Sequence, residues 1–113
     1  MRLKSALWAA AYLRRCQVEG CSAVVRRRGA EEAGAIFVRI CRLDGTSDLF
    51  GPAPQSALDP DGADRIFSAC LASQPAADDQ VEAYLVREIK FDSDLWVIEV
   101  EDRAGRNFLH VVS

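Results

Sequence analysis

Apolar positions alternate with polar ones on both sides of a turn in the middle of the chain. Residues 35–43 and 46–50 are the two runs, and Asp44-Gly45 between them is typical of a two-residue hairpin turn. Such a loop places Arg39 opposite Phe50 and predicts an antiparallel hairpin. The side chains on its predicted core face are Ile36, Val38, Ile40 and Leu49.

Three further segments have the composition of strands. Residues 22–28 predict a strand that joins the hairpin through the loop 29–34, which gives a three-stranded antiparallel meander. Residues 95–101 predict another strand, with Glu99 and Glu101 on its solvated face. Residues 108–112 predict a short edge strand.

The first predicted helix covers about residues 5–19, with Ser5 as its N-cap and Gly20 after its end. Its residues 6–13 are apolar on every side, unlike a surface helix with one apolar stripe. We expect either deep burial or contact with a partner subunit. Trp8 and Tyr12, on a different face from Leu3, Leu7, Ala10 and Leu13, are the candidate interface anchors.

Two more helices are predicted in the second half. One opens near Asp59 or Asp61. Its apolar stripe is Ala63, Ile66, Phe67, Cys70 and Leu71. The other starts at Asp78 or Asp79, with a capping box between Asp79 and Glu82.

These elements predict one α+β domain over residues 1–113, with the element order α-β-β-β-α-α-β-(β). Amphipathic helices beside a mostly antiparallel sheet of four or five strands make a two-layer sandwich with about three helices. Hydrophobic residues make up 50% of the chain, which excludes the disordered class.

Charge is divided between the two halves of the chain. Residues 1–43 have nine basic and three acidic side chains, and residues 44–113 have five basic and fourteen acidic ones. Either the basic residues form one surface for nucleic acid, or the halves neutralise each other on folding. We favour the second, with Glu99 and Glu101 beside Arg26 and Arg28 or beside Arg39.

No apolar run approaches the ~20 residues that span a bilayer, and the basic and apolar start of the chain lacks a cleavage signal. We therefore expect a cytoplasmic protein without membrane contact. The four cysteines (Cys16, Cys21, Cys41 and Cys70) show no CxxC spacing, so buried thiols are the simplest interpretation.

The sequence offers no convincing catalytic or metal-binding set. His110 is the only histidine, and the sequence contains neither of the glycine-rich phosphate-binding motifs, GxxxxGK(S/T) and GxGxxG. Glu99 and Glu101 share a strand face, but a solvated face explains them better than paired acid catalysis. We expect no cofactor and no metal, lean against an enzyme, and assign no role to the cysteines or His110.

Four blocks resemble a family of small bacterial proteins known only as a domain of unknown function. The blocks are residues 1–5, residues 34–39, residues 48–55, and residues 87–92 with 94–102. The resemblance covers nearly the whole chain. It implies a stand-alone, cytoplasmic bacterial domain and supplies no catalytic residues.

Two functions follow from these patterns. The preferred one is a non-enzymatic protein-interaction module, with a homodimer formed through the first helix or an edge strand as one arrangement. The alternative is binding of RNA or single-stranded nucleic acid on a basic and aromatic sheet face. The residues of that face are Arg26, Arg28, Phe37, Arg39 and Phe50.

Overall fold

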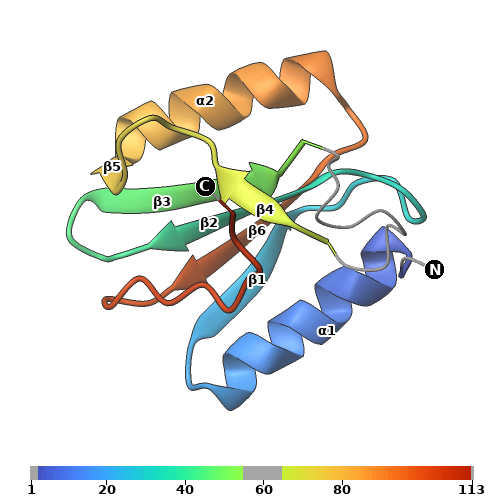
Figure 1. The fold of residues 1–113 in the computed structure, drawn as a ribbon, viewed down its shortest axis with the longest axis horizontal. Helices are drawn as coiled ribbons and strands as arrows, with labels where there is room; N and C mark the ends of the chain where they lie inside the picture. The colour runs from blue at the N-terminus through green and yellow to red at the C-terminus, as the bar shows by residue number, and fades with distance from the viewer. Residues whose placement is uncertain (1–2, 55–64, 113) are drawn as a thin grey trace.

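The computed structural model describes residues 3–54 and 65–112, and in these ranges six strands form one mixed sheet between two helices (Figure 1). The elements are α1 (Ser5–Val18), β1 (Ser22–Arg27), β2 (Ile36–Cys41), β3 (Thr46–Pro52), β4 (Phe67–Ala69), β5 (Ala76–Ala77), α2 (Asp78–Phe91) and β6 (Trp96–Glu101). The sheet order is β1-β6-β2-β3-β4, with β5 paired to β3. The α+β class and the mostly antiparallel sheet are confirmed.

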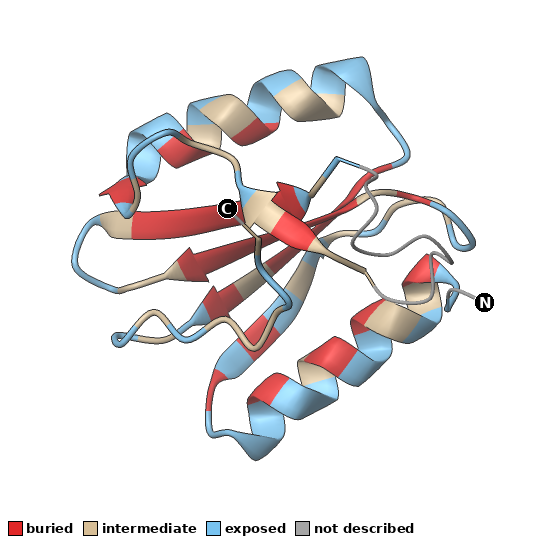
Figure 2. Cartoon of the chain, in the orientation of Figure 1, coloured by how far each residue is buried: buried red, intermediate tan, exposed pale blue. Residues whose placement is uncertain are grey.

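Each face of the sheet carries its own helix, so the domain has three layers rather than the two predicted. On one face, Ala9, Tyr12 and Cys16 of α1 pack against the sheet; on the other, Val81 and Leu85 of α2 do so. Figure 2 shows the buried residues of each helix along the side that faces the sheet. A sheet covered on both faces buries successive residues of its central strands.

The hairpin exists, but its register differs by one residue from the prediction. Arg39 pairs with Leu49, because the loop has three residues, Leu43-Asp44-Gly45, with positive φ at Leu43 and Gly45. Asp44 stabilises this turn by accepting hydrogen bonds from the backbone and hydroxyl of Thr46, at 2.9 and 2.6 Å. A shift of one residue exchanges the faces of a strand. Leu49 therefore lies on the α2 side and Phe50 on the α1 side.

The predicted meander is wrong because β6 lies between β1 and β2. It pairs antiparallel with β1 and parallel with β2. The loop between β1 and β2 passes over the start of β6, where a Cβ on Gly29 or Gly34 would lie 2.2 or 2.3 Å from the Asp94 carbonyl oxygen. Only glycine permits this approach. The uninterrupted apolar run before Glu99 is the sequence signal of such a central strand.

The predicted helix through Phe67 is also wrong where the structure describes it. Phe67–Ala69 forms β4 and pairs antiparallel with β3, and the Cys70 amide donates to the Leu49 carbonyl at 2.9 Å. Pairing along β3 overrides the helical spacing of the apolar residues. Its proposed caps, Asp59 and Asp61, lie outside the described residues. The predicted edge strand near the C-terminus is reduced to one bridge between Phe67 and Val111.

The two remaining helices are confirmed, but not their capping. Lys4 occupies the N-cap of α1, while the buried Ser5 hydroxyl donates to the Gly34 carbonyl at 2.6 Å. Ala77 precedes α2 without a side-chain cap, so the Asp79–Glu82 capping box does not form. Glu82 is instead engaged by arginines from the sheet.

Candidate functional site

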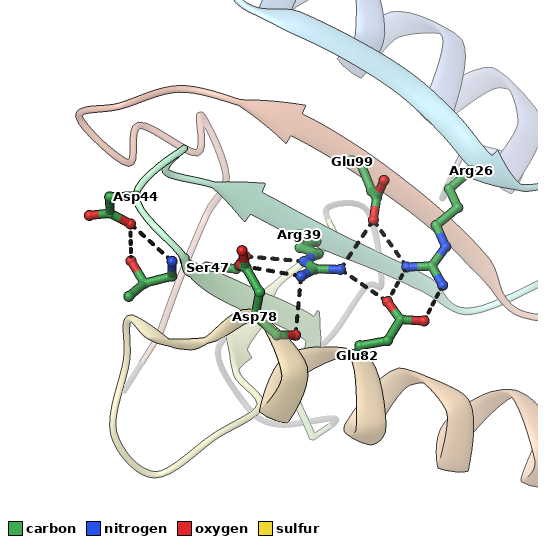
Figure 3. A network of polar contacts seen from close by, with 8 residues as sticks. Arg26, Arg39, Asp44, Ser47, Asp78, Glu82 and Glu99 are labelled. Atoms are coloured by element: carbon green, nitrogen blue, oxygen red, sulfur yellow. Dashed lines mark hydrogen bonds and ion pairs between the residues drawn. The ribbon is translucent and has the colours of Figure 1, made fainter.

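A polar network joins α2 to the sheet (Figure 3). It consists of Arg26, Arg39, Ser47, Asp78, Glu82 and Glu99. Arg39 lies at its centre and is 8% exposed. Its Nη1 is 3.1 Å from Glu82 and 3.4 Å from Glu99, and its Nη2 is 3.3 Å from Asp78. Its Nε donates to Ser47 at 3.1 Å, and the Ser47 hydroxyl donates to Asp78.

Arg26 extends the network from β1. Its Nη1 donates to Glu82 at 2.8 Å and to Glu99 at 3.0 Å. The hydrogen bond from Arg26 holds the pKa of Glu82 below its usual value. The prediction that early arginines and late carboxylates neutralise each other is confirmed at Arg26 and Arg39. Arg28 departs from it, because its guanidinium lies 4.8 Å from the centre of the Trp96 ring.

This network is a structural tie rather than a reactive centre. Each of its carboxylates lies within ion-pair distance of a guanidinium, so these side chains are engaged in contacts within the chain rather than free to act on a substrate. The two glutamates considered as paired acids separate, since Glu99 belongs to the network and Glu101 is exposed.

The thiols are unsuited to nucleophilic chemistry. All four cysteines are free, and burial raises the pKa of each thiol, to about 11 for Cys70. A thiol with a raised pKa stays protonated at neutral pH and reacts poorly. His110 is exposed near the C-terminus. Among the residues that the structure describes, no three His, Cys, Asp or Glu side chains gather as metal ligands would.

The residues of the nucleic-acid alternative do not form one open surface. Phe37, Arg39 and Phe50 are each 8% exposed. Phe37 and Arg39 lie on the α2 side of the sheet, whereas Phe50 lies beneath α1. Arg26 is held by Glu82 and Glu99, and Arg28 by Trp96. The alternative therefore loses the surface on which it depended.

The concave feature of interest is a hollow of about 330 Å³ beside α1, which we call the α1 hollow. Its lining consists of Leu3, Trp8, Ala11, Tyr12, Arg15, Arg65 and Phe108. It lies between one side of α1 and the C-terminal segment, and Phe108 there adopts a positive φ of 56°. A bulky residue in this conformation is strained and persists only where its surroundings hold it.

The structure places the two predicted interface residues differently. Tyr12 is 5% exposed, and its hydroxyl donates to the Asn107 carbonyl at 2.7 Å. Trp8 is half-buried and stacks on Tyr12, with ring centres 5.0 Å apart. Both therefore anchor α1 within the chain, and they also line the hollow. Small residues at Ser5, Ala9 and Cys16 permit this close packing.

The outward face of α1 and the residues just before the helix carry exposed apolar side chains. Leu3 is 51% and Leu7 is 58% exposed, and Val18 further along is 73% exposed. Leu7, Ala11 and Val18 share one helix face with Arg14. Sequence reasoning missed Ala11, Arg15 and Phe108 as site residues. The sequence signal for this site was that α1 is apolar on every side, because the sheet can cover only one side of a helix and the remaining apolar residues stay exposed.

The chain matches other proteins over its whole length. Residues 3–110 match the family model DUF1491, described as a protein of unknown function. A crystal structure of a DUF1491 family protein from Caulobacter crescentus CB15 is 35% identical, with both chains covered at 100% and a TM-score of 0.81. The solution structure of protein Atu0922 from A. tumefaciens is 46% identical, covers 100% of this chain and 97% of that one, and has a TM-score of 0.84.

No curated protein matches the chain. No helix in the part of the chain that the structure describes is long and apolar enough to cross a membrane. The family match over residues 3–110 contains the four sequence blocks except for the first two residues, so the resemblance found in the sequence is confirmed. The chain belongs to DUF1491, a family of proteins of unknown function.

Proposed function

We propose that this protein is a non-enzymatic protein-interaction module that binds its partner over the outward face of α1 and the α1 hollow. The observation that carries the proposal is the continuity of these two features. Exposed apolar side chains at Leu3 and Leu7 adjoin a concavity whose lining includes three aromatic residues. Protein interfaces concentrate their binding energy where a side chain enters such a pocket.

Two further observations support a binding role over catalysis. The carboxylates of the polar network are engaged by arginines, and burial raises the pKa values of the thiols. Neither group faces the hollow, whose lining contains no carboxylate, thiol or histidine among the described residues. The hollow therefore offers shape, apolar surface and positive charge.

The test compares two variants that change exposed residues on opposite sides of the sheet. Ala11→Gln fills the hollow without altering charge, and it replaces the best helix former with another good one. Phe91→Ser removes a side chain that is 88% exposed at the end of α2 and serves as the matched control. Unchanged circular dichroism and thermal unfolding would show that both variants fold.

Proteins captured from the native host by the tagged chain would be purified, and their affinities measured by calorimetry. We expect a saturable partner whose binding weakens about tenfold or more on Ala11→Gln and stays within twofold on Phe91→Ser. Equal binding by wild type and Ala11→Gln would overturn the proposal, as would the absence of any saturable partner. Sedimentation velocity at high micromolar concentration would show whether the partner is a second copy.

A further inference from the structure

The described rim of the α1 hollow carries positive charge and no carboxylate. Arg15 is 58% exposed and donates its Nε to Glu19 at 3.3 Å, while its two Nη groups make no hydrogen bond to another described residue. Across the hollow, Nη2 of Arg65 donates to the Leu3 carbonyl and the Ser5 hydroxyl, each at 3.0 Å. Two guanidinium groups thus border one apolar concavity.

The aromatic rings of the hollow already pack against neighbouring rings or guanidinium groups. The Trp8 ring stacks on Tyr12 at 5.0 Å and meets Phe67 at 5.3 Å. The Phe108 ring lies under the guanidinium groups of Arg15 and Arg106, at 5.1 and 5.4 Å. A nucleobase needs a free ring face on which to stack. Because these neighbours already occupy ring faces, we favour as the occupant a protein side chain that packs against Leu3 and Ala11.

Charge also disfavours a second copy as the occupant. In a two-fold contact each subunit presents the same patch. In a two-fold contact whose axis passes near Arg14 and Arg15, each of these residues would lie close to its own copy in the other protomer, and like charges would repel. An acidic partner removes this repulsion and gains attraction.

We propose that the partner offers an acidic segment, with one large apolar side chain in the α1 hollow and a neighbouring carboxylate on the Nη groups of Arg15. This inference rests on the proposed interaction function and specifies the chemistry that the site recognises. The apolar side chain supplies the buried contact area. The carboxylate supplies orientation and selectivity, because a guanidinium binds the two oxygens in a fixed geometry.

Two matched synthetic peptides test this chemistry. In one, a single phenylalanine is flanked by glutamates; in the other, the same phenylalanine is flanked by lysines. Each would be titrated into the full-length, isotope-labelled protein and followed by NMR. We expect the glutamate peptide to shift the amide signals of Trp8, Ala11 and Phe108, with affinity that falls as salt is added, and the lysine peptide to bind more weakly.

Two charge-matched variants identify the carboxylate contact. Arg15→Gln should weaken the glutamate peptide about two- to fivefold, whereas Arg14→Gln, one residue away on the outward face, should weaken it less. Equal effects of the two variants, stronger binding of the lysine peptide, or no binding of the glutamate peptide at millimolar concentration would overturn the inference.

The outcomes separate this inference from the proposed function. If Ala11→Gln abolishes binding of the native partner while Arg15→Gln and salt have no effect, the hollow is an interaction site without acidic selectivity. Self-association blocked by Ala11→Gln would make the occupant a second copy and overturn the acidic partner. Single-stranded RNA that displaces the glutamate peptide and binds more tightly would overturn both proposals.

Discussion

The two faces of the sheet attach their helices by different means. On the α2 face, apolar contacts of Val81 and Leu85 are supplemented by a polar network centred on Arg39. On the α1 face, attachment depends on large apolar and aromatic side chains such as Trp96 and Tyr12. Ion pairs connect α2 to side chains of several strands. In contrast, α1 packs against the sheet along one side, and the hollow lies along another side of the same helix.

This difference bears on function. A network of hydrogen-bonded charges holds a helix in one position. The polar groups in such a network are occupied by one another and are not available for a reactive site. Aromatic packing leaves charged side chains at its margin, such as Arg15, available to a partner. The face with fewer polar contacts is therefore the one on which we propose a binding surface.

The largest effect should come from removing apolar volume on the α1 face. Trp96 is 1% exposed, and its Nε1 donates to the Ala30 carbonyl at 2.8 Å. Trp96→Ala should lower the free energy of unfolding by about 3–5 kcal/mol. Denaturant unfolding measures this loss, which should change little with salt. Phe91→Ala, at an exposed site, is the control, and an equal loss in both would contradict a core role for Trp96.

The next largest effect should come from the centre of the network on the α2 face. Arg39→Met keeps most of the side-chain volume but leaves Asp78, Glu82 and Glu99 without their shared cation. Because these carboxylates are only partly buried, we expect a loss of about 2–4 kcal/mol, less than for a fully buried pair.

Salt and a control variant distinguish this effect from a change in packing. The loss caused by Arg39→Met should become smaller in high salt, which weakens the ion pairs of the wild type. Arg103→Met removes one positive charge from an exposed turn and should cost less than about 0.5 kcal/mol. A similar loss in both variants would show that net charge, and not the network, matters.

The smallest effect concerns the pH dependence of the same face. The pKa of Glu82 is lowered in the folded state, chiefly by the hydrogen bond from Arg26. Its ionised form therefore contributes stability above the unfolded-state pKa of about 4.3, and this contribution is lost as the pH falls through the folded-state pKa. Since Glu82 is partly exposed, the contribution at neutral pH should be roughly 0.5–1 kcal/mol.

Unfolding of the wild type and Glu82→Gln from pH 7 to pH 3 tests this sign. The difference in unfolding free energy between the two proteins should be greatest near neutrality and should shrink in acid. Glu88→Gln, on the same helix but outside the network, is the control. A difference that grows as the pH falls would refute the role assigned to the Arg26–Glu82 pair.

Local patterns predicted some parts of the fold correctly and failed at particular residues. Asp44-Gly45 indicated the hairpin, but the choice between a two- and a three-residue loop depended on Leu43 adopting a positive φ. Phe67 had helical spacing with its neighbours, yet it pairs with β3 because that strand has unpaired backbone groups beside it. Only a small part of the candidate site was predicted, since Trp8 and Tyr12 were named but Arg15 and Phe108 were not.

By itself, the sequence determined the α+β class and both described helices. It also determined that strands lie between residues 22 and 50 and between residues 95 and 101. Finally, it determined that early arginines pair with late carboxylates. These features follow from the hydrophobic periodicity and the charge pattern of the sequence, because both depend on which neighbouring residues face the core and which face solvent. Only the tertiary structure decided that β6 lies between β1 and β2, that each face carries one helix, and that a hollow borders α1. Strand order and concavity depend on contacts between residues far apart in the chain, and no local period encodes them.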